Sequence, residues 1–163
     1  MVRKNNFKSA GAIVLGMHDA LVSLTGLISG LAIAMADRYA IILTAIIASI
    51  TASLSMGASN YLAVRAGGGR RAFISALYTG GAYMATCALL ILPFFIFSNR
   101  AVEMIVMFVI AVAEIFGFNY YLGRVNQQPY MRSFFEMLGV CVCVSIVAFL
   151  IGLCAQYCMN VTI

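Results

Sequence analysis

Charged residues are scarce in this sequence of 163 residues: 9 % are Asp, Glu, Lys or Arg, whereas 64 % are hydrophobic. A soluble domain carries about 25 % charged residues and about half apolar ones, so the composition excludes a soluble globular domain. The mean hydropathy of +1.03 predicts an all-α integral membrane protein surrounded by lipid. We therefore interpret the net charge of +5 as a signal of orientation across a bilayer and expect no nucleic-acid partner.

The sequence also lacks the patterns that mark common catalytic and metal centres. Its five cysteines lie in apolar runs without the spacing of a zinc site or a disulfide scaffold, which favours small buried side chains. No nucleophile is paired with a base, and no closed set of metal ligands is present. We therefore expect a protein that is not an enzyme and that holds no tightly bound cofactor. The cysteines are Cys87, Cys141, Cys143, Cys154 and Cys158.

Long apolar runs are abundant. Five of them exceed the roughly 20 residues that cross a hydrocarbon core of about 30 Å. The connections between them, such as "AGGGRR", are too short to fold separately, so residues 1–163 are expected to form a single membrane domain. The predicted transmembrane helices cover residues 10–36, 40–64, 72–97, 101–123 and 134–158.

Basic residues are distributed unequally between the two sides of these five spans. Arg38 and Arg100 alone fall on one side, and the other side holds the N-terminus and most of the positive charge. The positive-inside rule then predicts a cytoplasmic N-terminus and a C-terminus on the opposite side. Because five spans cannot be divided into two equal repeats, a symmetric homodimer is the simplest way to enclose a central pathway. The basic residues on the N-terminal side are Arg3, Lys4, Lys8, Arg65, Arg70, Arg71, Arg124 and Arg132.

A carboxylate, Asp19, lies inside the first span. Ionisable groups at this depth cost on the order of several kcal/mol and usually face a bundle interior or a wet cavity. Ser23, Gly26 and Gly30 follow at helical spacing, so they share its face, and the two glycines allow close helix contact. Two interpretations remain open: an ion pathway between helices, or a packing stripe from which Asp19 reaches the cytoplasmic interface.

The second span carries a line of polar residues with a methionine among them. Ser49, Ser53, Met56 and Asn60 recur at helical spacing. A thioether beside carboxylate oxygen suits a borderline divalent ion such as iron(II) better than calcium or magnesium. A methionine in a membrane span is nevertheless most often a core residue, so spacing alone does not assign the role of Met56.

Two further titratable residues lie within spans. Glu114 shares a face of the fourth span with Tyr121, and it either carries protons or faces a partner helix. His18, beside Asp19, titrates near neutral pH, supplies a nitrogen ligand, or is a satisfied structural group. The sequence does not decide between these roles.

Four stretches, taken in order, resemble the vacuolar iron transporter family. They are "GMHDALVSLTGLISGL", "ASLSMGASNYLAVR", "ALYTGGAYMATCALLILPF" and "FNYYLGRVNQQPYMRSFFEM", and the likeness covers nearly the whole chain. The resemblance implies five spans and a homodimer that exports iron(II) or manganese(II) from the cytoplasm in exchange for protons. It assigns Asp19 and Met56 to the metal and Tyr83 to the pathway, lined by the first two helices. Similarity to prokaryotic members implies the inner (cytoplasmic) membrane.

The sequence departs from this family pattern in three places. Ala48 and Asn60 stand where many relatives have acidic residues, and "AGGGRR" replaces a glutamate-rich cytoplasmic metal-binding domain. The pathway therefore has fewer carboxylates, with His18, Ser23, Ser53, Asn60 and Glu114 as further candidate lining residues. These losses motivate an alternative, a non-transporting membrane subunit that kept the fold. A carrier of soft metals that uses Met56 and the cysteines is a third hypothesis.

Overall fold

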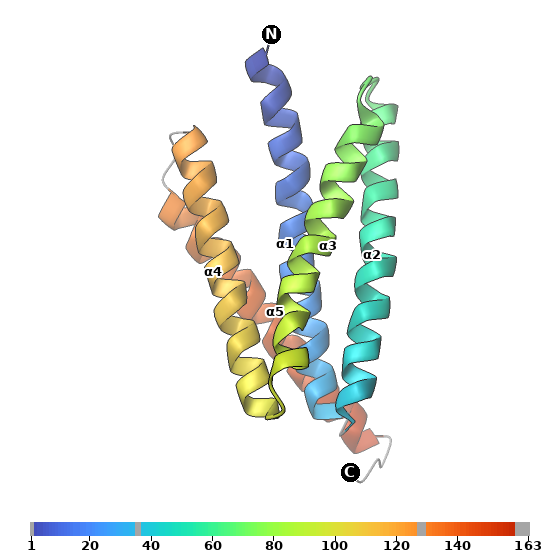
Figure 1. Cartoon of the computed structure of the whole chain (residues 1–163), viewed down its shortest axis with the longest axis vertical. Helices are drawn as coiled ribbons and strands as arrows, with labels where there is room; N and C mark the ends of the chain where they lie inside the picture. Colours follow the sequence, from blue (N-terminus) through green and yellow to red (C-terminus); the bar gives the residue numbers. More distant parts are fainter. Residues whose placement is uncertain (1, 35–36, 127–129, 159–163) are drawn as a thin grey trace.

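The computed structural model describes residues 2–34, 37–126 and 130–158, and all five of the helices in these ranges are α-helices (Figure 1). They form an up-and-down bundle in which the N-terminus and the α2–α3 connection lie at one end and the C-terminus at the other. The helices are α1 (Val2–Ala34), α2 (Arg38–Ala66), α3 (Ala72–Ile96), α4 (Arg100–Asn126) and α5 (Tyr130–Cys158).

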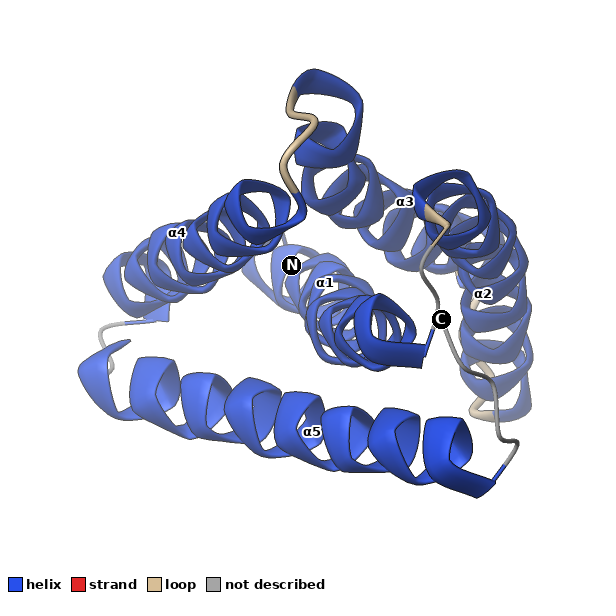
Figure 2. Ribbon diagram, turned by 90° about the horizontal axis from the view of Figure 1, so that it is seen from below, coloured by secondary structure: helices blue, strands red, loops and turns tan. Residues whose placement is uncertain are grey.

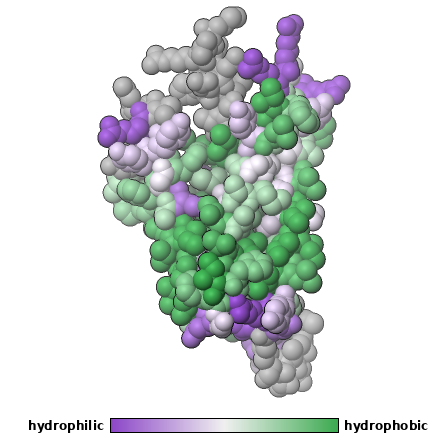
Figure 3. Space-filling model, viewed as in Figure 1, coloured by the Kyte–Doolittle hydropathy of each residue, from purple (hydrophilic) through white to green (hydrophobic). Residues whose placement is uncertain are grey.

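All five helices are long and apolar enough to cross a membrane. Figure 3 shows the corresponding apolar band around the middle of the bundle, with hydrophilic residues gathered towards both ends. The predicted five-helix membrane fold is therefore confirmed, and the predicted bounds of the last four helices agree with the structure to within a few residues, whereas α1 begins at Val2, eight residues before the predicted start. The apolar part of α1 begins at Gly11, and the predicted end of this span at Ala36 lies outside the described residues. Orientation and homodimerisation stay predictions.

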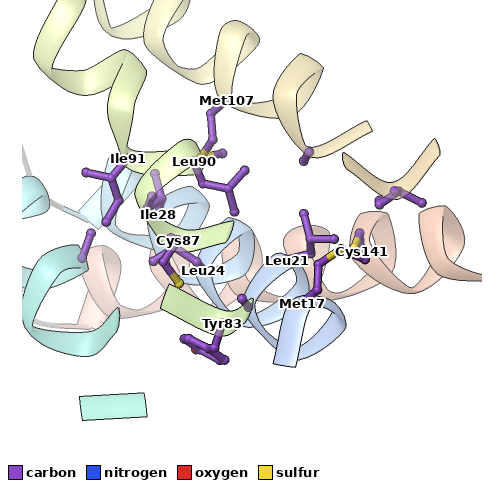
Figure 4. Close-up of a cluster of buried hydrophobic side chains, with 14 of the residues drawn as sticks. Met17, Leu21, Leu24, Ile28, Tyr83, Cys87, Leu90, Ile91, Met107 and Cys141 are labelled. Atoms are coloured by element: carbon purple, nitrogen blue, oxygen red, sulfur yellow. The ribbon is translucent and has the colours of Figure 1, made fainter. Parts of the chain in front are cut away.

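Helix α1 occupies the centre of the bundle, with the other four helices around it (Figure 2). Its side chains Leu21, Leu24 and Ile28 are at most 2 % exposed. They meet Leu90 of α3 and Met107 of α4 in one continuous core (Figure 4). A helix that is surrounded in this way is apolar on most of its circumference. The polar side chains of α1 therefore stand out by position as well as by chemistry.

Glycines bring α1 and α5 into close contact. A Cβ atom added to Gly152 would lie 2.6 Å from the carbonyl oxygen of Gly30, and one added to Gly26 would lie 3.1 Å from Val144. Lipid tails are as apolar as the helices, so association in a bilayer relies on such close backbone packing. The small residues Gly26 and Gly30 thus pack against α5, as the packing interpretation of this face predicts.

A second glycine seam joins α2 to α3. A Cβ atom on Gly80 would lie 3.0 Å from the carbonyl oxygen of Ser53, and one on Gly57 would lie 3.3 Å from that of Ala76. The α2–α3 pair and the α1–α5 pair are therefore both built on backbone-to-backbone contact.

Arg38 joins three helices at the end of the bundle opposite the N-terminus. Its guanidinium group donates hydrogen bonds to the carbonyl oxygens of Phe94 and Phe97 at the end of α3. Its Nε lies 2.8 Å from Oε1 of Glu103 on α4, and Glu103 is 2 % exposed. The last carbonyls of a helix lack partners within that helix and carry partial negative charge, so a cation is favourable there. One side chain thus satisfies the end of α3 and neutralises a buried carboxylate.

Arg100 plays a comparable role for α1. Its Nη1 donates a hydrogen bond of 3.2 Å to the carbonyl oxygen of Ala32 in the last turn of that helix. The two arginines that the sequence assigns to the less basic side therefore both bond to helix ends. Nothing in the sequence pattern pairs Glu103 with Arg38, because the two residues lie on different helices far apart in the chain.

We expect Gly152→Ala to destabilise the protein by about 1–3 kcal/mol, because the added methyl group overlaps the backbone of Gly30. Thermal unfolding in detergent, followed by circular dichroism, measures the effect. Gly139→Ala, on the same helix, is the control, since nothing lies within 4 Å of its added Cβ. An unfolding temperature of Gly152→Ala equal to that of the control would contradict the close contact.

Glu103→Gln is expected to lower stability by about 3 kcal/mol, because Arg38 loses the charge that compensates it. The partial exposure of Arg38, 31 %, keeps the effect at the lower end of the range for buried pairs. Glu136→Gln removes the exposed pair with Arg132 and should change little. Equal unfolding temperatures for the two variants would show that the Arg38–Glu103 pair contributes nothing.

Candidate functional site

The candidate residues lie at a similar depth in the membrane. Counted from the span ends on the N-terminal side of the bundle, at 1.5 Å per residue, Asp19 is about 12 Å deep and Met56 about 15 Å. Tyr83 and Glu114 lie about 15–17 Å deep by the same measure. Four residues from four different helices therefore fall in one layer across the bundle, at about a third to a half of the length of their spans.

Ser23 links Asp19 to Tyr83 across the α1–α3 interface. Its hydroxyl group donates to the backbone carbonyl oxygen of Asp19 at 2.6 Å and lies 2.8 Å from the hydroxyl oxygen of Tyr83. A serine hydroxyl has one hydrogen, which is engaged by Asp19, so Tyr83 donates to Ser23. The structure therefore brings together three of the residues that the sequence singled out.

The carboxylate of Asp19 is on an open face of the chain. Asp19 and Ser23 are exposed, whereas Tyr83 behind them is 3 % exposed. Within the described ranges, no basic side chain forms an ion pair with Asp19. Direct contact of an ionised carboxylate with lipid at this depth costs on the order of several kcal/mol, so water, a cation or another protein surface has to cover it.

The polar line on α2 is mostly satisfied inside the chain. The hydroxyl of Ser53 donates to the carbonyl oxygen of Ile50 at 2.9 Å, and Asn60 Oδ1 accepts a hydrogen bond of 2.7 Å from Ser75 of α3. Met56 is half-buried and packs against the core. Among the described residues, no hydrogen bond or ion pair involves Met56. Its sulfur atom therefore has no polar contact with the Asp19 carboxylate there.

The described His, Cys, Asp and Glu side chains of a single chain do not gather into a metal site. Among the described residues there is no group of three or more His, Cys, Asp or Glu side chains that is placed to hold a metal ion. The Asp19 carboxylate and the Met56 thioether are therefore an incomplete ligand set within a single copy.

His18 and Glu114 are placed away from the open face of Asp19. The ring of His18 meets the edge of Phe118 on α4, with 6.3 Å between ring centroids, and its Nε2 is buried without a hydrogen-bond partner in the described chain. Glu114, one turn before Phe118, has both carboxylate oxygens buried. These two residues thus belong to the α4 side of the bundle rather than to the Asp19–Ser23–Tyr83 contact.

Cys87 is a residue whose position the sequence analysis missed. It is 0 % exposed, lies near Ser49 of α2, and is within electrostatic range of both Asp19 and Glu114. The spacing of four residues from Tyr83 was the available signal, because it puts both side chains on one face of α3.

The expectation that the cysteines are buried holds for Cys87 and Cys141 but is wrong for the other three. Cys143, Cys154 and Cys158 are exposed on α5. Helix α5 is apolar around its whole circumference. The sequence pattern therefore does not distinguish the side that faces outward from the side that packs on the bundle.

Tyr83→Phe should cost about 1 kcal/mol of stability, because Ser23 keeps its bond to Asp19 and loses only the Tyr83 donor. Thermal unfolding in detergent measures the loss. Tyr78→Phe, at a tyrosine of the same helix that is 45 % exposed, serves as the control and should be neutral. A neutral Tyr83→Phe would show that the 2.8 Å contact does not stabilise the α1–α3 interface.

Comparison with known protein families gives a match over the part of the chain that forms the first two membrane helices. A family model described as the VIT family matches residues 10–68, about a third of the chain. This segment contains Asp19, Ser23 and Met56, and it ends just beyond α2. No match was found among curated proteins. The part of the chain that forms the membrane portion of α1 and the whole of α2 is thus similar to the VIT family, whose members are metal-ion transporters.

Proposed function

We propose that the protein exports iron(II) or manganese(II) from the cytoplasm in exchange for protons. The observation that carries the proposal is Asp19, a carboxylate exposed at mid-membrane within the segment that matches the VIT family. A bare carboxylate at this depth attracts a cation and is unfavourable against lipid. The transported metal and the proton are the two cations that neutralise it in turn.

A homodimer supports this role because it covers the open face. A two-fold axis beside α1 presents the same residues from both copies, so the two Asp19 side chains face each other. Ser23, exposed next to Asp19, is then removed from lipid by the same contact. We place the pathway along this axis, where the protein's partner is a second copy of itself.

The chemistry of the ligands favours a borderline transition metal. Two Asp19 carboxylates supply hard oxygen ligands and Met56 supplies a softer sulfur ligand, a mixture that suits iron(II) and manganese(II) better than calcium. Ala48 is neutral, and the amide oxygen of Asn60 already accepts a bond from Ser75. Asp19 is therefore the principal carboxylate of the metal path.

Two like charges at one axis make the metal and the proton compete. Carboxylates that approach each other do not both ionise readily, so one of them holds a proton when no metal is bound. Entry of a divalent ion displaces that proton.

In this scheme the basic residues keep the N-terminus in the cytoplasm, with the inner membrane of a prokaryote as the proposed location. The family match does not favour the non-transporting alternative.

Asp19→Asn is expected to reduce transport to the level of empty liposomes, because the amide neither attracts the ion nor exchanges a proton. The measurement is uptake of Fe²⁺ and Mn²⁺ into proteoliposomes under a pH gradient, and Met56→Leu should lose part of the rate. The control is Asp37→Asn, which keeps the oxygen that accepts a bond from the Tyr39 amide at the start of α2. Transport by Asp19→Asn at the unmodified rate would overturn the assignment.

A further inference from the structure

A second carboxylate, Glu114, is buried in the membrane interior away from the proposed metal path. It lies near the middle of α4, and both of its oxygens are shielded from solvent. Thr86 of α3 is close enough to influence the carboxylate, yet neither oxygen has hydrogen-bond geometry to any described residue. In the described part of the chain no Lys or Arg pairs with it either. The transport scheme above leaves this group without a role.

The free-energy cost of burying a charge limits the protonation state that Glu114 can adopt. An ionised carboxylate in such surroundings is unfavourable by several kcal/mol, in order of magnitude, unless a cation compensates it. The described residues hold no cluster of His, Cys, Asp and Glu side chains that could bind a metal ion here. A proton needs no ligand cage, so it is the cation that these surroundings accommodate.

The groups that face Glu114 are neutral or weakly charged. From α3 come the hydroxyl of Thr86 and the thiol of Cys87. The titratable group that α1 places against α4 is His18, whose ring meets Phe118 one turn after Glu114. The titratable group that α5 turns towards the core is another thiol, Cys141. None of these side chains supplies a fixed positive charge, so the carboxyl group is free to gain and lose a proton.

Cys87 connects this group to the metal path. Its thiol interacts electrostatically with both Glu114 and Asp19, and its neighbour one turn away on α3, Tyr83, donates to Ser23 beside Asp19. A charge gained or lost at one carboxylate is therefore felt at the other through a packed, water-poor interface. Coupling of a proton to a metal ion requires such contact between the two sites.

We propose that Glu114 is a proton-carrying group of the exchange, separate from the Asp19–Met56 metal path. The carboxylate binds a proton that enters from the far side, forming one O–H bond, and this bond breaks again when the proton leaves towards the cytoplasm. No other bond changes. The inference rests on the proposed metal–proton exchange and extends it by assigning a proton site on the α3–α4 side of the bundle.

The test compares Glu114→Gln with the unmodified protein in proteoliposomes, with Mn²⁺ as the metal. We expect Mn²⁺ to move down its own concentration gradient at equal pH, while Mn²⁺-driven proton movement, read with an internal pH dye, falls to the share that the Asp19 pair carries. Glu114→Asp keeps a carboxyl group and should retain part of the proton signal. Glu136→Gln, at the exposed pair with Arg132, should behave like the unmodified protein.

Three results would overturn the inference. Unchanged proton movement in Glu114→Gln would show that another group carries the proton. Loss of Mn²⁺ movement at equal pH, in a variant that unfolds at the normal temperature, would place Glu114 in the metal path. A third readout is independent of transport: the infrared band of a protonated carboxyl group should titrate with pH and disappear in Glu114→Gln, and no such band would refute a proton site. Absence of metal movement in the unmodified protein instead refutes only the proposed transport function.

Discussion

The bilayer interior offers no water to a polar group, and the internal contacts of this bundle follow from that constraint. Hydroxyl groups on the helices bond back to carbonyl oxygens one turn earlier, as Ser29 does to Thr25 and Ser49 does to Ala45. Asn119 bonds to Ile115 in the same way. A polar group that is satisfied by such a local bond needs no ligand, so it is not a candidate for a binding site. The ionisable groups within the spans that remain unsatisfied in the described chain, Asp19, His18 and Glu114, are therefore the ones that require a ligand, a partner or a proton.

One face of the central helix α1 packs against α5 over part of its length and carries exposed polar side chains over another part. Gly26 and Gly30 meet α5, where a side chain larger than hydrogen does not fit, while Asp19 and Ser23 one to two turns earlier stay open. The reason is that α5 crosses α1 at an angle (Figure 1), so it covers only part of this stripe. The packing interpretation therefore holds for the part of this stripe that contains the glycines, and the pathway interpretation of its open part, at Asp19, stays a prediction.

Helix α3 stands between the two membrane carboxylates. Tyr83 reaches Ser23 on the Asp19 side, whereas Thr86 lies near Glu114 and Cys87 is within electrostatic range of both carboxylates. At the far end of the bundle, Arg38 bonds to the last carbonyls of α3 and to Glu103 of α4, so the base of the α3–α4 pair is fixed.

The sequence by itself determined the five helices, their bounds and the separation of their ends into two sides, because a membrane helix closes its backbone bonds within one segment. It also identified Asp19 and its stripe, since helical spacing is a local property. Only the tertiary structure decided that Arg38 pairs with Glu103, that Tyr83 bonds to Ser23, and that Cys87 comes within electrostatic range of both Asp19 and Glu114. In lipid, an apolar helix has no single apolar face, so its hydropathy does not predict which helix it packs against.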